Sequence, residues 1–326
     1  MLGVTSMRSF LAVLLIIASM VTACKVSPSS TVVSVETSSN GLEYFGFAVV
    51  DCGWDDPHDD EIRTNYVDEV TGFTNVAQMC VYDATENLQS RIELFSKANI
   101  KALLHIELIL FTHQPSIFTG SGVKAKLRSD AQERWNVFVE TNRDWLNEGK
   151  VAGFYIADEP VWNGISEKDF TQAVAIVKES FPSIPTVSIE AYPVIDRIMV
   201  PETLDWVGFD YYDSTDPLND PVYQDYLDIV LAARTRDDQR VVIVASTQWL
   251  PYYKTAEDIS SDDMADVIQS YFDLAVSLPE SIALIGYLWP GGLDDADQLG
   301  ARELPENVQV LLQEIGDEII NGQKGK

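Results

Sequence analysis

The sequence predicts an α/β fold, a single-domain (β/α)8 TIM barrel, from three observations. Its 326 residues match a barrel of about 250 residues plus an export segment and a tether. Eight short apolar or β-branched runs recur along the chain, separated by stretches with helical periodicity. No Gly-rich phosphate turn follows the first run, where residues 51–54 read DCGW. A closed barrel is therefore favoured over a doubly wound open sheet.

The eight runs give the strands of the barrel in chain order. They are rich in Val, Ile, Ala and aromatic residues, as strands of a buried parallel sheet are. The predicted strands are 44–51, 75–82, 102–109, 152–157, 186–189, 206–211, 241–246 and 283–288.

The stretches between the runs predict helices over 87–98, 130–147, 167–180, 262–277 and 305–314. Ser166 followed by Asp169 resembles a capping box at the start of one of them. Pro305 suits the first turn of the last one. Between the fifth and sixth strands, Pro193 and Pro201 leave room for only a short helix.

Residues 1–23 have the features of a bacterial signal peptide. Arg8 gives a positive start, 10–20 form an apolar run, and small residues precede Cys24. This arrangement resembles a lipobox, which implies cleavage before Cys24 and lipidation of its sulfur. An ordinary signal peptide with an incidental cysteine is the alternative. In a Gram-negative cell, Lys25 in the next position favours the outer membrane, on its periplasmic or surface face.

The rest of the chain is expected to form one domain. Residues 24–40 are rich in Ser, Thr and Val without apolar periodicity, which predicts a flexible tether to the lipid anchor. The barrel is predicted over 41–320 and a disordered tail over 321–326. The sequence contains no internal repeat and no low-complexity block, and nothing in it indicates an oligomeric state.

Two further cysteines, Cys52 and Cys80, lie in the predicted barrel. The strand assignment places them near the same end of neighbouring strands. Export through an oxidising compartment favours a disulfide if they lie close together. Two buried free thiols are the alternative.

The formal net charge is -29, from 51 acidic and 22 basic residues. Nucleic acid is not expected as a partner, because binding it needs clustered Lys and Arg. A neutral or cationic glycan fits this charge better than a strongly anionic one. Solubility alone also explains such acidity.

Polar and aromatic side chains gather at the carboxyl ends of the predicted strands, where barrel enzymes have their active sites. At any single strand end a solvated loop explains a carboxylate equally well. Together, carboxylates interleaved with Trp and Tyr are typical of a sugar cleft, because aromatic faces stack on sugar rings while carboxylates and amides bind hydroxyls. The candidate substrate contacts are Asp51, Trp54, His105, Glu107, Glu190, Tyr211, Tyr212, Gln248, Trp249, Tyr287 and Trp289.

The fourth predicted strand and the residues after it, 153–160, read GFYIADEP. This segment resembles the strand-four signature of barrel glycoside hydrolases, in which Asn or Asp precedes a Glu followed by Pro. The resemblance implies a glycosidase acting on an oligo- or polysaccharide, with Glu159 as proton donor. It also implies that Asp158 contacts a substrate hydroxyl or tunes the acid.

Glycosidic bond cleavage also asks for a second, ionised carboxylate as nucleophile or base. In the largest clan with this signature that residue is a Glu ending strand seven, but Gln248 stands there and cannot ionise. The remaining candidates are Asp210, Glu190 and Glu107. Asp210 ranks first because it ends a buried apolar run. Burying a carboxylate there costs free energy, which is typical of a functional residue.

A second resemblance is to chitinase-like barrels, in which an acetamido group of the substrate is the nucleophile. They have an acid Glu at strand four, a Tyr and an Asp at strand six, and a strand-eight Trp lining the cleft floor. The positions that fit are Glu159, Asp210, Tyr211 or Tyr212, and Trp289. The resemblance is partial, because Ala157 and Tyr155 stand where that family has acidic residues.

Other chemistries fit the sequence less well. The chain has only His58, His105 and His113, whereas a metal-dependent barrel hydrolase needs several clustered His ligands, so no metal is expected. No strand end carries the Lys that Schiff-base chemistry requires, and no cofactor is expected. The second class of function is a non-catalytic glycan-binding lipoprotein that has lost its nucleophile, with Gln248 as its main support.

Overall fold

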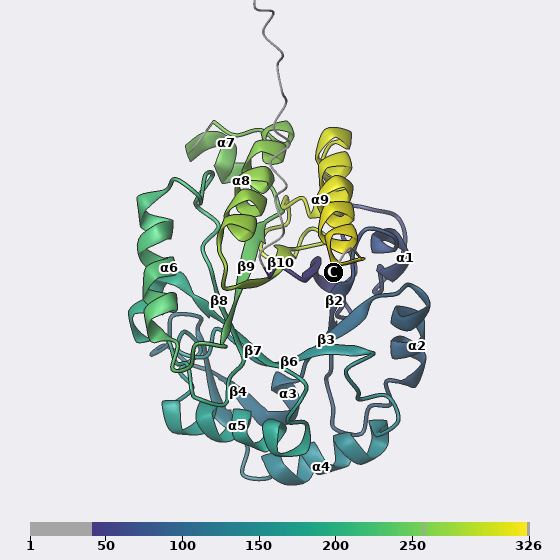
Figure 1. The fold of residues 1–326 in the computed structure, drawn as a ribbon, viewed down its shortest axis with the longest axis vertical. Coiled ribbons are helices and arrows are strands. Elements are labelled where there is room, and N and C mark those ends of the chain that lie inside the picture. The colour runs from purple at the N-terminus through teal and green to yellow at the C-terminus, as the bar shows by residue number, and fades with distance from the viewer. Residues whose placement is uncertain (1–40, 257, 325–326) are drawn as a thin grey trace, which may run out of the picture. The chain divides into compact units, whose positions relative to one another are not determined.

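The described part of the chain forms a closed barrel of eight parallel strands (Figure 1). This computed structural model describes residues 41–324 except residue 257, so the predicted signal peptide, Cys24 and the tether lie outside the described residues. Each strand pairs with the next along the chain, and the last pairs with the first. In order they are β1 (Tyr44–Asp51), β2 (Val76–Cys80), β3 (Lys101–His105), β6 (Val151–Asp158), β7 (Thr186–Ala191), β8 (Trp206–Asp210), β9 (Arg240–Ser246) and β10 (Ser281–Tyr287).

The predicted (β/α)8 architecture is confirmed, and seven of the eight predicted strands agree with the observed bounds within two residues. The third is the exception. It ends at His105, and the chain then turns into a short helix, α3 (Glu107–Leu110). The prediction ran on to residue 109 because a short apolar run has no periodicity that separates a strand from one buried helical turn.

Helices cover the outside of the barrel (Figure 1). The longer ones are α2 (Gln89–Lys97), α4 (Ala131–Asn142), α5 (Glu167–Ser180), α6 (Pro221–Ala233), α8 (Met264–Ser277) and α9 (Glu306–Lys324). Short helical segments are α1 (Val67–Val70), η1 (Tyr192–Arg197), α7 (Pro251–Ala256), η2 (Ser261–Asp263) and η3 (Ala301–Glu303). As predicted, the connection between the fifth and sixth strands is short, and the Ser166 side chain caps α5 by accepting the Asp169 N–H.

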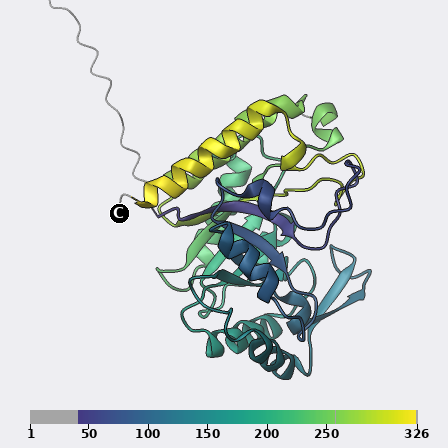
Figure 2. The ribbon, with the colours of Figure 1, turned by 90° about the vertical axis from the view of Figure 1, so that its right-hand side faces the viewer.

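Two helices depart from the prediction. Helix α6 was not predicted, although Asp220 accepts the Val222 N–H as its N-cap and Pro221 occupies the first position. Helix α9 continues past the predicted end at residue 314, so the expected tail at 321–326 is helical as far as Lys324. Helix α9 packs against β1 (Figure 2). Gly316 lets the helix also lie close to the segment before β2, because a Cβ there would lie 1.9 Å from the Phe73 carbonyl oxygen.

The core has two parts. One lies inside the barrel and is built from inward-facing residues such as Leu103, Ile189, Val244 and Ile285. The other lies between the strands and the helices. This division follows from strand alternation, which points successive side chains to opposite faces of the sheet. No helix among the described residues has the length and apolar character needed to span a bilayer.

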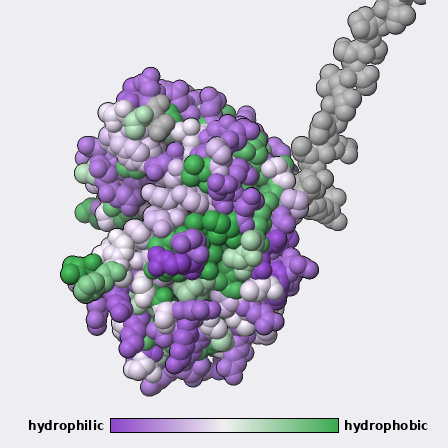
Figure 3. All heavy atoms as spheres, turned by 90° about the vertical axis from the view of Figure 1, so that its left-hand side faces the viewer, coloured by the Kyte–Doolittle hydropathy of each residue, from purple (hydrophilic) through white to green (hydrophobic). Residues whose placement is uncertain are grey.

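A β-hairpin that was not predicted follows α3. It consists of β4 (Phe111–Pro115) and β5 (Val123–Leu127), paired antiparallel. In Figure 2 this hairpin and the loop after β1 project on the same side of the barrel. Both follow the carboxyl ends of barrel strands, which is the side where barrel enzymes have their sites. The hairpin turn carries Ile117 and Phe118, both more than nine-tenths exposed; the surface in Figure 3 is otherwise largely hydrophilic, with apolar areas among it.

Candidate active site

A cavity of about 720 Å³ opens at the carboxyl ends of the strands. Its inner part is lined by aliphatic residues of the barrel interior, including Leu103, Val244 and Ile285. Its outer part is lined by polar and aromatic residues that end the strands or follow them. The predicted site residues that line it are Trp54, His105, Asp158, Glu159, Asp210, Tyr212 and Tyr287.

Glu159 directly follows β6 and lines the cavity in a strained backbone conformation. Its φ is +45°, a left-handed value that costs a residue with a Cβ free energy and is found at functional sites. Its N–H donates to the Ile189 carbonyl of β7 (2.8 Å), and its own carbonyl accepts the Asn163 N–H (2.8 Å). The backbone of the neighbouring strand and loop therefore fixes where this carboxyl group emerges.

The carboxyl groups of Glu159 and Asp210 hydrogen-bond to each other. Burial raises the pKa of Glu159 to about 8, and Asp158 and Glu190 add to this by repulsion. Burial and the Glu159 charge raise the pKa of Asp210 well above its ordinary value. Two carboxyl groups in contact cannot both ionise easily, so the pair shares a proton at neutral pH.

Asp158 connects this pair to β3. Its carboxylate accepts the Tyr155 hydroxyl, and the Tyr155 ring stacks on His105 with ring centres 4.7 Å apart. Asp158 faces the open cavity but is otherwise surrounded by protein, and this burial raises its pKa. Because Tyr155 has a pKa raised well above its ordinary value, its hydroxyl keeps its proton and remains a donor to Asp158.

Glu107 lies behind this group and holds it in place through hydrogen bonds. One oxygen accepts the Asp158 N–H (2.9 Å) and faces His105 Nε2 (3.2 Å), while the other faces His113 Nε2 (2.6 Å). Although burial opposes ionisation, these partners lower the pKa of Glu107 to about 2. Glu107 does not line the main cavity. It lines a smaller cavity of about 280 Å³ that shares Cys80, Tyr82 and His105 with the main one.

Glu190 is buried beneath the loop that follows Glu159. Its carboxylate accepts the backbone N–H groups of Val161 (2.9 Å), Trp162 (3.2 Å) and Ala191 (3.1 Å). Burial raises its pKa to about 7 even though these N–H donors oppose the shift. Glu190 therefore holds the loop in place rather than facing the cavity.

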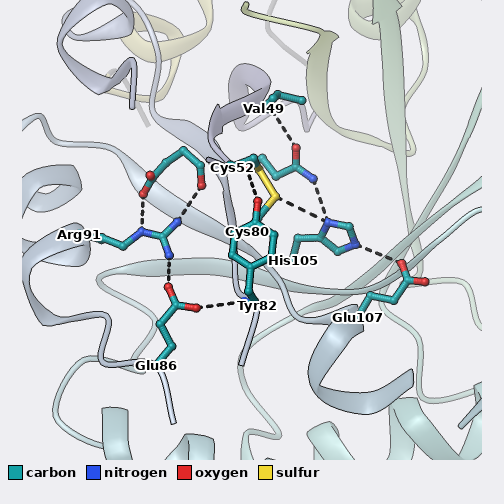
Figure 4. The surroundings of a disulfide bond; sticks show 10 residues. Val49, Cys52, Cys80, Tyr82, Glu86, Arg91, His105 and Glu107 are labelled. Atoms are coloured by element: carbon teal, nitrogen blue, oxygen red, sulfur yellow. Dashed lines mark hydrogen bonds and ion pairs between the residues drawn. A yellow bond between two sulfur atoms is a disulfide. The ribbon is translucent and has the colours of Figure 1, made fainter. Parts of the chain in front are cut away.

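The predicted disulfide between Cys52 and Cys80 is present and lines the cavity wall (Figure 4). It joins the loop after β1 to the end of β2. Beside it, Gln78 accepts the Val49 N–H (2.8 Å) with its oxygen and directs its amide nitrogen at His105 Nδ1 (3.3 Å). Since that nitrogen can only donate, His105 Nδ1 is the acceptor, and the ring proton is on Nε2, facing Glu107.

Tyrosines form another wall of the cavity. The rings of Tyr212 and Tyr287 stack with centres 5.0 Å apart. The Tyr287 hydroxyl lies 3.1 and 2.9 Å from the two carboxylate oxygens of Asp294, which also lines the cavity. Asp294 was not among the predicted site residues, because it follows a Gly-Gly turn beyond the last strand instead of ending it. Tyr82 and Gln78 were also missed.

Several predicted contacts do not reach the cavity, because other parts of the fold use their side chains. Asp51 pairs with Arg91 (2.7 Å), and Tyr211 packs on tyrosines next to α6. Gln248 is buried against Gln298, and the Trp249 indole donates to the Ile259 carbonyl. Trp289 packs between Phe47 and Phe73 and donates to Glu69. The strand-eight aromatic that lines the cavity is Tyr287, so the expectation for Trp289 from chitinase-like barrels is corrected.

Among the described residues, one group has ligand atoms close enough to hold a metal ion, namely Asp56, His58 and Glu303. It does not line the cavity. Its atoms already have partners, since His58 Nδ1 lies 2.7 Å from Glu303 and Asp56 pairs with Arg302 at 3.1 Å. This group therefore joins the loop after β1 to the segment after β10 with bonds of its own.

No family model matches the chain, and no curated protein matches it. Solved structures do match. The chain is similar to a GH10 xylanase of Thermobacillus composti (TM-score 0.52, 10% identity, covering 86% of this chain and 98% of that one). It is also similar to an α-amylase of Anoxybacillus (TM-score 0.57, 13% identity, 87% and 79%). A third is a GH2 β-galacturonidase of Eisenbergiella tayi (TM-score 0.58, 9% identity, 85% and 51%).

These likenesses agree on the architecture. The fold is a (β/α)8 barrel. At 9 to 13% identity the likeness extends to the fold alone, and the chemistry of this barrel has to be argued from its own cavity.

Proposed function

We propose that this protein is a glycosidase that hydrolyses an oligo- or polysaccharide, with Glu159 as proton donor and Asp210 as the partner carboxylate. One observation carries the proposal: the two carboxyl groups share a hydrogen bond in a cavity of about 720 Å³ at the carboxyl ends of the strands. The fold that holds them is similar to those of a xylanase, an amylase and a galacturonidase.

The shared proton supports acid catalysis at neutral pH. With its pKa raised to about 8, Glu159 carries a proton and can deliver it to the leaving oxygen as the glycosidic bond breaks. In the free protein, burial and the Glu159 charge raise the pKa of Asp210 well above its ordinary value, so the proposal requires Asp210 to lose its proton when substrate enters. The ionised Asp210 then stabilises the positive anomeric carbon. It either bonds to that carbon or takes the proton of the water that adds to it.

The spacing of the pair is shorter than in either standard arrangement. Retaining pairs are about 5 Å apart and inverting pairs about 6.5 to 9.5 Å, whereas Glu159 and Asp210 are in direct contact. Substrate entry therefore has to separate the two carboxyl groups. Both residues have a fixed backbone, because Asp210 is paired with Ala191 of β7 and Glu159 donates to Ile189, so we expect their side chains to turn apart.

The experiment first screens the purified domain on a panel of polysaccharides and then compares variants on the substrate found. Glu159→Gln should lower kcat by about 10³-fold or more while sugar binding is retained. The control is Glu167→Gln, which removes an exposed carboxylate from the first turn of α5 and should leave kcat unchanged.

The alternative is a glycan-binding protein without catalysis. Its support is that β9 ends in Gln248, buried against Gln298, so this strand contributes no carboxylate to the cavity. Sugar binding by the wild-type protein without hydrolysis of any glycan in the panel would favour this alternative. Neither binding nor hydrolysis would rule out both.

The cellular location belongs to the same proposal. We expect export and lipidation at Cys24, on the outer membrane. The Cys52–Cys80 disulfide supports an oxidising compartment. Cell fractionation tests it, because Cys24→Ser should move the protein from the membrane to the soluble fraction.

A further inference from the structure

We propose that the cavity takes a positively charged sugar, namely an oligosaccharide of amino sugars with a free ammonium group, and that Asp294 pairs with this ammonium. The inference rests on the proposed function and names its substrate class. Asp294 has no part in the bond cleavage proposed above, so its role can be tested separately.

The charges that line the cavity are all of one sign. Four lining residues carry carboxyl groups: Asp158, Glu159, Asp210 and Asp294. Among the lining residues in the described part of the chain there is neither Lys nor Arg. Glu190 lies just behind them and adds a fifth acidic group that repels Glu159.

The cationic groups close to this wall are already used. His105 accepts at Nδ1 from Gln78 and faces the ionised Glu107 with Nε2. Although burial opposes it, the hydrogen bond to Glu107 raises the pKa of His105, so any positive charge on the ring is paired with Glu107. Arg91 lies near Tyr82 at the edge, but it is paired with Asp51 and Glu86. Within the described residues, the carboxyl cluster therefore has no Lys or Arg partner in the cavity lining, and His105 offsets only part of the charge, at Asp158.

The lining also suits an ammonium group in shape and chemistry. Asp294 is exposed to the cavity and held in place by the Tyr287 hydroxyl and the Gln298 amide (3.0 Å). Trp54, Tyr82, Tyr212 and Tyr287 present aromatic rings. Rings of this kind stack on sugar faces and also attract a cation. A carboxylate beside such rings selects for an ammonium over a hydroxyl in the same position.

A bound cation should also change the protonation of the site. The pKa values of Glu159, Asp210 and Asp158 are raised by burial and by mutual repulsion, and Asp294 adds to the repulsion on Glu159 and Asp158. Of the other groups that face the cluster, Tyr155, Tyr212 and Tyr287 bring no positive charge, and His105 lowers the pKa of Asp158 without reversing its upward shift. An ammonium in the cavity lowers these pKa values, so its binding should release protons, whereas a neutral sugar should release few.

The test compares matched sugars that differ only at the amino position. Methyl glycosides and β-1,4-linked tetrasaccharides of glucosamine, N-acetylglucosamine and glucose are titrated calorimetrically into the Glu159→Gln variant, which keeps the substrate intact. We expect the amino form to bind at least about 10-fold more tightly at low salt, with the preference shrinking as ionic strength rises. Titrations of the wild-type protein with methyl glucosaminide in buffers of different ionisation enthalpy should show proton release.

Asp294→Asn, made on the same background, should remove most of the preference for the amino form and leave binding of the other two sugars unchanged. The matched control is Asp297→Asn, which removes the same charge from an exposed position of the same loop that does not line the cavity. That control should keep the preference. Thermal unfolding of both variants checks that they fold, and the salt dependence of the unsubstituted Glu159→Gln protein tests the inference without any change at Asp294.

Equal or tighter binding of the acetylated or neutral sugar would overturn the inference and leave the proposed glycosidase function standing. A preference for the amino form that survives in Asp294→Asn would refute the role of Asp294. If no sugar binds and no polysaccharide is hydrolysed, the proposed function fails and the inference fails with it.

Discussion

Two acidic clusters at the same end of the barrel differ in whether the protein neutralises them. In the first, Arg302 lies among Asp56 (3.1 Å), Asp59 (2.5 Å) and Glu69 (2.9 Å). In the second, the charged neighbours that raise the pKa values of Glu159 and Asp210 are each other and further carboxyl groups. The composition of the chain does not distinguish them. In the first cluster, Arg302 neutralises the carboxylates and so holds the loops together. In the second, the carboxyl groups have no arginine partner in the cavity, so they can hold a proton and bind a ligand.

The largest expected effect on stability comes from breaking the neutralised cluster. Arg302→Leu removes the cation that three carboxylates share and leaves only Glu69 with another arginine, Arg63 (2.9 Å). Because these groups are partly exposed, we expect the free energy of unfolding to fall by about 3 kcal/mol, the lower end for a broken buried pair. Urea denaturation measures it. Arg143→Leu is the control, because its partner Glu140 is also largely exposed, and such a pair contributes less than about 1 kcal/mol. A similar small loss for both variants would mean that the Arg302 cluster does not hold the loops together.

The unneutralised cluster should make the protein less stable as pH rises, whereas a carboxylate in a salt bridge makes a protein less stable as pH falls. Folding raises the pKa of Glu159 to about 8 and of Glu190 to about 7, both from 4.5. Between these values the folded state binds more protons than the unfolded one, so stability is fully present below about pH 4.5 and falls as pH rises through 8. Since the carboxyl groups reach water through the cavity, we expect a loss of about 2 to 3 kcal/mol over this range.

Urea denaturation at a series of pH values measures this loss. Glu159→Gln should flatten the curve, because it removes one of the two titrating partners. Glu107, whose pKa is lowered to about 2, acts only below its unfolded pKa and therefore leaves this window unaffected. A stability that rises from pH 5 to 8 would contradict the shared proton.

The smallest effect concerns Trp289, which belongs to the neutralised cluster through its bond to Glu69 (2.6 Å). Trp289→Phe keeps most of the packing and removes this hydrogen bond, so we expect a loss of about 1 to 2 kcal/mol. Sugar affinity should not change, since Trp289 does not line the cavity. Weaker sugar binding in this variant would mean that Trp289 contributes to the sugar site, which would contradict the separation of the two clusters.

The barrel could be predicted from the sequence because its strands are buried on both faces and appear as apolar runs. The hairpin of β4 and β5 could not, since its residues are mostly exposed and carry no such run. Helix α6 had a readable signal in Asp220 and Pro221.

For the site, position at a strand end located Glu159 and Asp210 but did not fix the direction of their neighbours. Tyr287 ends β10 and faces the cavity, whereas Trp289 is two residues further on and lies in the core. Beyond a strand end the chain no longer alternates regularly, so inward and outward positions have to be seen in the fold. The protonation state of the cavity carboxyl groups also could not be predicted from the sequence, because it depends on which cations the fold brings close to them.

The hydrogen bonds from the loop after β6 to Glu190 affect which substitutions this barrel can accept without moving its proton donor. Glu190 holds main-chain N–H groups at Val161 and Trp162 instead of side chains, so a new residue at position 161 leaves the acid where it is. The location of Glu159 is thus inherited from the adjacent strand, and exchange of β7 would disturb the acid more than many changes beside it. Directed evolution of new specificity is best aimed at the loops after β1 and β10, which shape the cavity without carrying the proton donor.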